Sequence, residues 1–250
     1  MIKFSIITCT YNAAKELPRT LQSVAEQQYD DIEHIIIDGK SKDDTLQIIK
    51  EYAAVAAANR IIIYTSEPDK GLYDAMNKGI QRVTGNYVIF LNAGDKFHNA
   101  QTLHDVATQL QADALPGVVY GNTDIVDDEG KYIGPRHLKP PTTLTWRSFS
   151  NGMLVCHQAF YARTDIAKRT PYDLQYRLSA DVDWCIRVMK TAEEQALTLY
   201  NTQLVLCDYL AGGMSIKNHR ASLIERFNIM RKHYGLIKTV IRHITFIFRK

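Results

Sequence analysis

Apolar runs and helical patterns alternate along the first hundred residues of the chain. Short runs rich in isoleucine, valine and aromatic residues predict strands at residues 3–9, 32–37, 61–64 and 87–91. Between them, apolar positions recur three and four residues apart and predict helices over residues 13–28, 43–55 and 73–83. Because the apolar runs are uninterrupted, we expect strands covered on both faces, as in a parallel sheet between helices. Repeated strand–helix units with short loops predict an open α/β sheet.

After Gly94 the alternation gives way to a mixed pattern of strands, turns and helices. Helical spacing returns over residues 103–110 and 181–190, and apolar runs predict strands over residues 118–126, 154–161 and 196–207. A tight turn at 128–130 leads to a further strand at Tyr132 and Ile133. Residues 135–151 have no period, and irregular segments of this length are often functional loops. We expect a single α/β domain over residues 1–213.

The composition supports a self-contained core in a reducing compartment. Hydrophobic residues make up 46% of the 250 residues, so the chain can bury a core that needs no disulfide or metal ion to stabilise it. Charged residues make up 23%, which does not indicate a largely disordered chain. No CxxC pair occurs, which favours buried free thiols over a disulfide or zinc site at Cys9, Cys156, Cys185 and Cys207. The first residues lack a cleavage site, and no apolar stretch reaches the ~18 residues of a membrane span. We therefore expect a cytoplasmic protein.

Residues 214–250 form a basic tail, in which nine lysines and arginines stand against a single acid, Glu225. Its last part has apolar residues at helical spacing (Ile237, Val240, Ile241, Ile244, Phe248) and basic residues elsewhere round the helix (Lys238, Arg242, Arg249). Two surfaces suit such a helix: an anionic membrane, contacted peripherally through residues 236–250, or a protein surface on this domain or on the second subunit of a homodimer. Nucleic acid is disfavoured as a partner, because no aromatic stacking platform is interleaved with the charges.

Polar side chains follow each of the first four predicted strands. Tyr11 and Asn12 follow the first strand, Asp38 the second, Asp69 the third and Asp95 the fourth. Because open α/β sheets bind ligands beyond the carboxyl ends of their strands, we expect these residues to line one crevice. Its carboxylates suit a divalent cation and the polar edge of a base.

The glycine-rich motifs that usually grip phosphates are missing. Neither GxGxxG nor GxxxxGK[ST] occurs, which argues against dinucleotide dehydrogenases and P-loop enzymes. A diphosphate would then be bound by a metal ion and scattered donors such as Lys70, Asn77 and Lys78. Mg²⁺ and Mn²⁺ need few protein ligands when phosphate oxygens and water complete their shell, so one aspartate suffices.

The segments SIITCTYN at 5–12, IIDGKSKDDT at 36–45 and the block 66–95 resemble one known family. The chain looks like an inverting family 2 glycosyltransferase of the GT-A fold. Within the block, SEPDKGLYDAMNKG at 66–79 is especially similar to bacterial enzymes that build capsular, exopolysaccharide or lipopolysaccharide units. The resemblance covers roughly residues 1–215 and implies a Rossmann-like, mostly parallel open sheet flanked by helices.

The resemblance implies a nucleotide site at the strand ends. Tyr11 would stack on the base, and Asp38 would accept a hydrogen bond from it. The other positions that match the nucleotide-binding segments are Thr8, Thr10, Asn12, Asp69, Asn77, Lys78 and Asn92. Neither Tyr11 nor Asp38 distinguishes uracil from guanine; a UDP-sugar is our expected donor. The alternative for Tyr11 is packing on a neighbouring helix.

By the same resemblance, Asp95 would be the ligand of Mn²⁺ or Mg²⁺, as the last acid of the family's aspartate-rich motif. Asn92 and Gly94 stand where many relatives have aspartates, which leaves one carboxylate. The Asn-x-Gly-Asp form is similar to that of a recognised sub-branch. The alternative for Asp95 is a turn residue, since this tetrapeptide is good turn chemistry.

Asp181 would be the catalytic base, because residues 179–184 resemble the family's Glu-Asp catalytic segment, with Ala180 in place of the glutamate. Inversion needs a carboxylate that takes the proton of the acceptor hydroxyl while the diphosphate leaves from the opposite face. A position near a helix N-terminus favours the ionised carboxylate. The alternative role is that of a helix N-cap, and with Asp183 the residue would also form a DxD of its own.

Contacts to the donor or acceptor are more weakly indicated for four residues: Asp74, His157, Asp183 and Trp184. His157 begins a His-Gln pair that the resemblance places near the cleft, but a buried, satisfied histidine is the alternative. Asp74, Asn77 and Lys78 also fit a solvated helix face.

These features predict a metal-dependent, inverting hexosyl- or N-acetylhexosaminyltransferase. Its acceptor would be a hydroxyl of a growing oligosaccharide or of a polyprenyl-linked one, at the cytoplasmic face of the inner membrane. A catalytically silent nucleotide-sugar-binding scaffold is one rival, favoured by Ala180 and the thinned acidic motif. A sugar-1-phosphate nucleotidylyltransferase is another, but it would need a glycine-rich basic loop that residues 8–12 lack.

Overall fold

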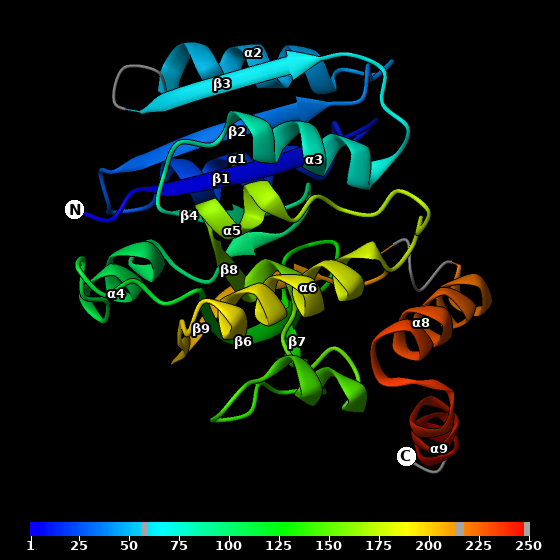
Figure 1. Ribbon diagram of the computed structural model, residues 1–250. Coiled ribbons are helices and arrows are strands. Elements are labelled where there is room, and N and C mark those ends of the chain that lie inside the picture. The colour runs from blue at the N-terminus through cyan, green and yellow to red at the C-terminus, as the bar shows by residue number, and fades with distance from the viewer. Residues whose placement is uncertain (57–59, 214–217, 248–250) are drawn as a thin grey trace.

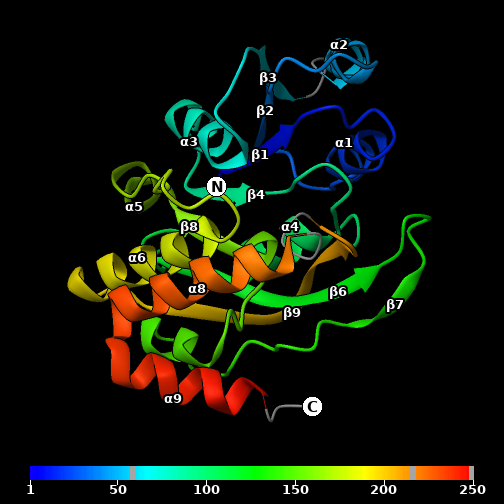
Figure 2. The same cartoon turned by 90° about the vertical axis from the view of Figure 1, so that its right-hand side faces the viewer.

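A mixed sheet runs through the centre of the molecule and carries helices on both faces (Figure 1, Figure 2). The structure is a computed structural model, and it describes residues 1–56, 60–213 and 218–247. Within these residues nine strands form one sheet in the order β3-β2-β1-β4-β8-β6-β9-β5, with β7 paired to β6. The strands are β1 (Phe4–Thr10), β2 (Ile32–Asp38), β3 (Ile61–Ser66), β4 (Tyr87–Phe90), β5 (Lys96–Phe97), β6 (Val118–Val126), β7 (Tyr132–Pro135), β8 (Phe160–Arg163) and β9 (Leu199–Leu210).

The helices alternate with strands in the first half of the chain, as predicted. They are α1 (Leu17–Ala25), α2 (Thr45–Ala56), α3 (Leu72–Arg82), α4 (Thr102–Thr108), α5 (Thr164–Arg169), α6 (Ala180–Glu194), α8 (His219–Tyr234) and α9 (Leu236–Ile247). Two 3-10 helices, η1 (Trp146–Asn151) and η2 (His157–Ala159), lie in the second half.

The first four strands are parallel, and their carboxyl ends reach the same side of the molecule (Figure 1). Thr10 pairs with Asp38, and Asp38 pairs with Ser66, so the three strand ends are in register. Every residue of β1, β2 and β4 is buried, as their uninterrupted apolar runs predict. For β3 the prediction is wrong: it is an edge strand, and Ile61 is 52% exposed.

The second half of the sheet is mixed. β8 runs antiparallel to β4 and β6, while β6 and β9 are parallel to each other. The two-residue strand β5, which was not predicted, pairs antiparallel with β9 and places Lys96 opposite Asp208. β5 follows Asp95 directly, so this short pairing holds the fourth strand's exit loop against β9.

One predicted strand is wrong in its first half. Residues 154–156 have no regular structure and His157–Ala159 form η2, so the strand begins only at Phe160. The apolar run here is buried because it lines the core, and burial alone does not distinguish a strand from a tight turn. By contrast, the strand predicted at 118–126 is confirmed with the same bounds.

Alternate side chains of the central strands divide the core into two layers. Ile7 and Phe90 face α3 and α6, whereas Ile6 and Ile89 pack on the opposite side with Leu103 of α4. All four cysteines are buried and free, as predicted.

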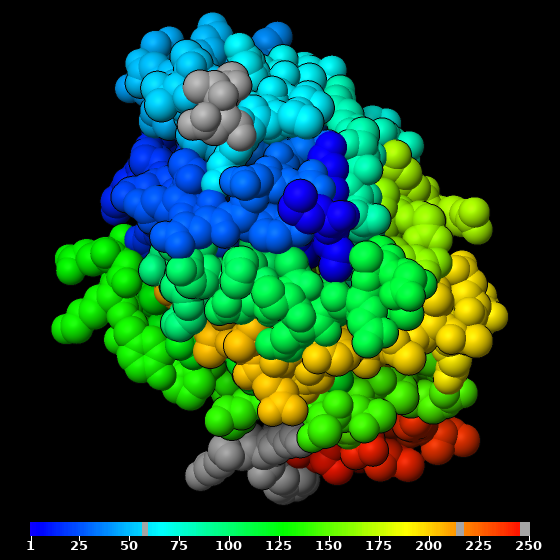
Figure 3. Space-filling view, turned by 90° about the vertical axis from the view of Figure 1, so that its left-hand side faces the viewer, coloured from blue at the N-terminus to red at the C-terminus, as the bar shows by residue number. Residues whose placement is uncertain are grey.

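The described part of the basic tail, residues 218–247, forms two helices, and the predicted helix positions Phe248 and Arg249 lie outside the described residues. Gly235 (φ 82°) ends α8 in the left-handed region that glycine adopts most easily, and α9 begins at the next residue. α9 lies at the end of the molecule opposite α2 and β3 (Figure 3), and α8 lies between it and α6 (Figure 2). Over the described residues we find no helix with the length and apolarity to cross a bilayer.

Candidate active site

The carboxyl ends of β1, β2 and β3 bring polar side chains together round Asp38. This carboxylate is fully buried, yet hydroxyl groups surround it: Ser41 Oγ donates to Oδ1, and Ser66 Oγ donates to Oδ2 at 2.5 Å. The Ser41 backbone N–H also donates to Oδ2 at 3.1 Å, so Oδ1 is the oxygen with capacity left to accept from a further donor.

Tyr11 and Asp69 meet over Gly39, next to Asp38. A Cβ at residue 39 would lie 2.5 Å from Asp69 Oδ2 and 3.3 Å from Tyr11 Cδ2, so the close approach requires glycine. The Tyr11 ring is 58% exposed and is therefore not packed into the core. The structure brings together three predicted nucleotide-binding residues, with an aromatic face available for stacking.

Three further nucleotide-binding candidates on β1 and its exit loop have different surroundings. Thr8 lies in the core, where its hydroxyl donates to the Leu91 carbonyl and contacts His34. The Thr10 hydroxyl is buried without a hydrogen-bond partner among the described residues. Asn12 ties the β1 exit loop to the loop after β2, because its Oδ1 accepts from Lys42 N at 2.8 Å.

The candidates on α3 contact protein groups. Both ends of the Asn77 amide bond to the backbone of Tyr172, at 2.7 and 3.0 Å. Lys78 Nζ lies 3.0 Å from Glu67 and donates to the Pro68 carbonyl, while Asp74 accepts from Lys70 N. These contacts fix the loop 67–71 and its neighbour, and nucleotide binding by Asn77 and Lys78 stays a prediction.

Asp95 lies at the carboxyl end of β4, and its side chain is held from two directions. Gln158 Nε2 donates to Oδ2 at 2.7 Å, and the Leu210 backbone N–H donates to Oδ1 at 3.0 Å. Thr20 Oγ1 donates to the Asp95 carbonyl, which ties this loop to α1. The carboxylate is therefore fixed by more than a local turn.

Burial raises the pKa of Asp95 to about 7, although the hydrogen bonds from Leu210 and Gln158 oppose the shift. A buried carboxylate without a cation is costly to ionise. The nearby Asn92 Oδ1 is also buried and has no hydrogen-bond partner among the described residues. An anionic and a neutral oxygen at one strand end fit a hard divalent cation, which prefers oxygen ligands.

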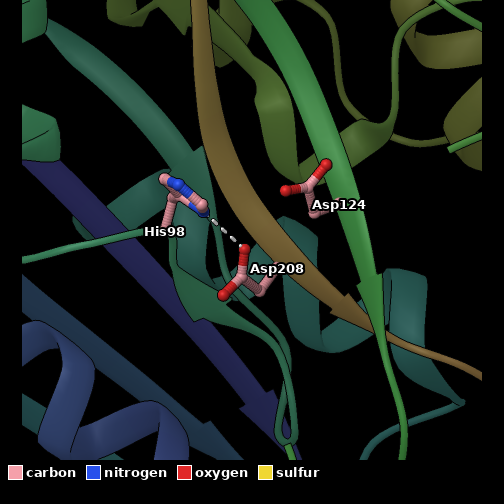
Figure 4. Close-up of side chains that lie close together, drawn as sticks. All are labelled: His98, Asp124 and Asp208. Carbon is pink, nitrogen blue, oxygen red and sulfur yellow. Dashed lines mark hydrogen bonds and ion pairs between the residues drawn. The ribbon is translucent and has the colours of Figure 1, made fainter. Parts of the chain in front are cut away.

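A second group could also ligate a metal: His98, Asp124 and Asp208, whose ligand atoms lie within 4.8 Å of one another (Figure 4). His98 Nδ1 is 2.8 Å from Asp208 Oδ1. Lys96 Nζ is 2.9 Å from Asp208 Oδ2 and already supplies a positive charge. This ammonium reduces the attraction for a cation, so the cluster is a weaker candidate than Asp95.

Asp181 is the second residue of α6. Its Oδ1 accepts from the Val182 backbone N–H at 3.0 Å and from the phenol of Tyr73 at 3.2 Å. Asp181 remains partly exposed, whereas its neighbours on both sides are buried. A half-buried carboxylate that keeps a solvent-facing side can receive a proton from a bound hydroxyl.

An aromatic cluster joins the two carboxylates. His157 stacks on Phe90 at 4.8 Å, and its Nε2 lies 2.5 Å from the Tyr172 hydroxyl. Tyr172 stacks on Tyr73, which donates to Asp181, and on Trp184. Burial lowers the pKa of His157 to about 4, so the ring is neutral, and donor or acceptor binding by His157 stays a prediction.

Asp95 and Asp181 both act electrostatically on Tyr209. Burial raises the pKa of Tyr209, and the negative charges of Asp95 and Asp181 both add to that rise. His157 and Gln158 are consecutive, and they lead to Tyr172 and to Asp95 respectively. The two carboxylates are therefore linked through one continuous set of contacts.

Asp183 faces α8, whereas Trp184 packs within the aromatic cluster against Tyr172 and His157. Burial alone would raise the pKa of Asp183, but hydrogen bonds and charges from His233 and Arg187 hold it below its ordinary value. Arg187 Nε lies 2.6 Å from Asp183, and His233 Nε2 lies 2.8 Å from it. Trp184 is fully buried and donates to the Thr170 carbonyl. Both residues thus have protein partners, and donor or acceptor binding by them stays a prediction.

Glu225 is a functional candidate that the sequence patterns missed. This acid on α8 accepts hydrogen bonds from the backbone N–H groups of Arg177, Leu178 and Ser179, at 2.8 to 2.9 Å. Those residues immediately precede α6, so Glu225 fixes the segment that leads to Asp181. The sequence feature that could have pointed to Glu225 is that it is the one acid in a tail with nine basic residues.

The chain matches the family described as Glycosyl transferase family 2 over residues 5–169. It is 36% identical over 214 residues to the PGL/p-HBAD biosynthesis glycosyltransferase of Mycobacterium tuberculosis, which covers 85% of this chain and 78% of that protein. The chain belongs to glycosyl transferase family 2. The family match ends before Asp181, so it does not include the predicted catalytic base.

Two solved structures have the same fold. Staphylococcus aureus TarS 1–349 in complex with UDP-GlcNAc matches with a TM-score of 0.75 and 20% identity, over 98% of this chain and 73% of that one. The mannosyltransferase PcManGT from Pyrobaculum calidifontis, in complex with GDP-Man and Mn²⁺, matches with a TM-score of 0.63 and 15% identity, over 100% and 76%. The predicted GT-A fold is confirmed.

Proposed function

We propose that the chain transfers a sugar, with inversion, from a nucleotide-diphosphate donor to a hydroxyl of a bacterial surface oligosaccharide. The observation that supports this proposal is the set of contacts from Asp95 through Gln158, His157, Tyr172 and Tyr73 to Asp181. The M. tuberculosis relative, named for PGL/p-HBAD biosynthesis, supports a surface glycoconjugate as product. The UDP-GlcNAc complex of TarS supports a UDP-sugar as donor.

The nucleotide would bind between Tyr11 and Asp38. The Tyr11 ring is exposed and suited to stack on a base, which contributes about 1–3 kcal/mol in comparable sites. Asp38 would accept a hydrogen bond from the base edge, and the hydroxyls of Ser41 and Ser66 hold its carboxylate in place. Asp69 lies against Gly39, next to Asp38.

The diphosphate would lie over Asp95. Asp95 would hold Mn²⁺ or Mg²⁺ with Asn92 nearby, and the cation, when bound, supplies positive charge to the leaving diphosphate. Gln158 and the Leu210 N–H keep the carboxylate oriented without neutralising it.

Asp181 would act as the base. Its carboxylate takes the proton of the acceptor hydroxyl while that oxygen forms a bond to the anomeric carbon. The bond between this carbon and the diphosphate oxygen breaks, and the diphosphate leaves with the electron pair. Attack opposite the leaving group inverts the anomeric configuration. Tyr73 donates to Oδ1, which leaves Oδ2 for the acceptor.

Calorimetric titration with UDP, GDP and CDP, each with Mn²⁺ and with a chelator, tests the nucleotide class and the cation dependence. We expect UDP to bind most tightly and the chelator to weaken it. Incubation with UDP-sugars then separates an enzyme from a silent binding protein, because slow hydrolysis of the donor accompanies transfer. Tight UDP binding without hydrolysis or transfer would favour the scaffold.

A further inference from the structure

The helix α9 presents an apolar stripe to solvent. Five apolar residues, each between 41% and 78% exposed, form it: Leu236, Ile237, Val240, Ile241 and Ile244. Their spacing of one, three and four residues places them on one side of the helix. Contiguous apolar side chains are rarely left exposed to water on a protein surface. Such a stripe therefore marks an interaction surface.

The opposite side of α9 holds the helix to the domain. Thr239 is fully buried, and His243 packs edge-on against Phe227 of α8 at 4.9 Å. At the turn between the helices, Tyr234 stacks on Trp146 and donates to its carbonyl. The hairpin is therefore fixed by its inner side, and the apolar stripe is not needed for its attachment.

Both helices of the hairpin carry cations. Arg220, Arg231 and Lys238 of the hairpin are exposed, and Arg242 is half-exposed. The hairpin's acid, Glu225, points inward and bonds to backbone N–H groups, so it does not offset these cations at the surface. The described surface of the hairpin combines apolar residues with lysine and arginine.

The hairpin lies on the side to which the active-site strand ends point (Figure 1, Figure 2). Glu225 anchors the backbone directly before Asp181, and His233 contacts Asp183 on the same helix α6. A surface bound to α9 would be held at a fixed position relative to Asp181.

We propose that α9 lies in the interface of a membrane that contains anionic lipids, with the apolar stripe below the headgroups and the cations among them. Apolar insertion and attraction to anionic headgroups together account for both features of the surface. A second copy of the chain fits less well, because a two-fold contact would bring the same cations of both copies together. The proposal rests on the hairpin and does not depend on the reaction.

Flotation of the full chain with lipid vesicles tests the proposal. We expect the protein to float with vesicles of phosphatidylcholine mixed with phosphatidylglycerol, less with phosphatidylcholine alone, and less at high salt. Ile237→Ser with Ile241→Ser should reduce partitioning by about tenfold per residue. Lys238→Gln with Arg242→Gln should reduce it by about fivefold per residue, and only on the anionic vesicles.

The matched controls are exposed residues elsewhere on the molecule. Val55→Ser with Ile133→Ser removes equally exposed apolar residues, and Lys50→Gln with Lys168→Gln removes exposed cations. Both double variants should float like the parent. Absence of flotation by the parent, or equal flotation of the Ile237 and Ile241 double variant, would overturn the proposal. So would a dimer in vesicle-free solution that dissociates in that variant, since it would assign the stripe to a second copy.

Discussion

The side-chain amide of Gln158 donates a hydrogen bond of 2.7 Å to Asp95 Oδ2, on a residue that is 4% exposed. The donor lies on η2 and the acceptor at the end of β4, so the contact joins two parts of the sheet. Gln158 holds the carboxylate in one orientation, while its neutral amide leaves the negative charge for a cation. Removing the donor would leave the carboxylate less oriented and harder to ionise.

We expect the affinity for a donor and Mn²⁺ to depend on pH through Asp95. Burial raises the pKa of Asp95 to about 7 without a cation, and a cation must displace the proton. Affinity should therefore rise by about tenfold per pH unit up to about pH 7 and level off above it. Titration with a nucleotide sugar, whose diphosphate does not titrate in this range, measures it. The Asp95→Asn variant should bind the nucleotide sugar and Mn²⁺ weakly at every pH. If the affinity of the parent did not change with pH, Asp95 would not be the metal ligand.

Replacing Asp181 with asparagine should stop the transfer and spare the binding of the donor. The amide keeps the shape and still accepts from Tyr73, but it cannot take a proton, so turnover should fall by about 10²- to 10⁴-fold. UDP affinity, measured by calorimetry, should stay within about twofold, since Asp181 is not one of the proposed nucleotide-binding residues. Asp165→Asn on α5 is the matched control. Normal turnover of the Asp181 variant would remove the residue from the mechanism.

The sequence predicts the rim of the site well because the carboxyl ends of parallel strands must meet. Tyr11, Asp38 and Asp69 follow three different strands, and the register of β1, β2 and β3 brings those strand ends together. The apolar runs are sufficient for this, since they define the strands and hence the side on which the polar residues emerge.

Contacts between distant segments could not be predicted in the same way. Gln158 reaches Asp95 across 63 residues, and Glu225 reaches Arg177 across 48. Each depends on how separate elements pack, and no periodicity or motif carries that information. The exposure of β3 has a similar cause, because strand order decides which apolar run lies at the edge.

The His98 cluster allows the two metal candidates to be separated. We expect His98→Ala to leave the Mn²⁺ dependence of donor binding unchanged, because Lys96 already neutralises Asp208 in that cluster. Asp95→Asn should weaken the same dependence. Calorimetry with and without a chelator measures both variants. The opposite result, in which His98→Ala loses the dependence and Asp95→Asn keeps it, would move the cation to His98, Asp124 and Asp208.

Replacing Glu225 with glutamine should lower turnover without weakening the binding of the nucleotide-sugar donor. A carboxylate accepts from the three N–H groups before α6, but an amide places two donors of its own among them. We expect unfolding to become easier by about 1–3 kcal/mol and kcat to fall, because Asp181 loses its fixed approach to the acceptor. The donor Kd should be unchanged. The matched control is Ile229→Val on the same helix, which should lower the free energy of unfolding by about 0.5–1.5 kcal/mol. The Ile229 side chain does not bond to these N–H groups. If Ile229→Val lowered kcat as much as Glu225→Gln, the loss would follow stability alone, and Glu225 would have no positioning role.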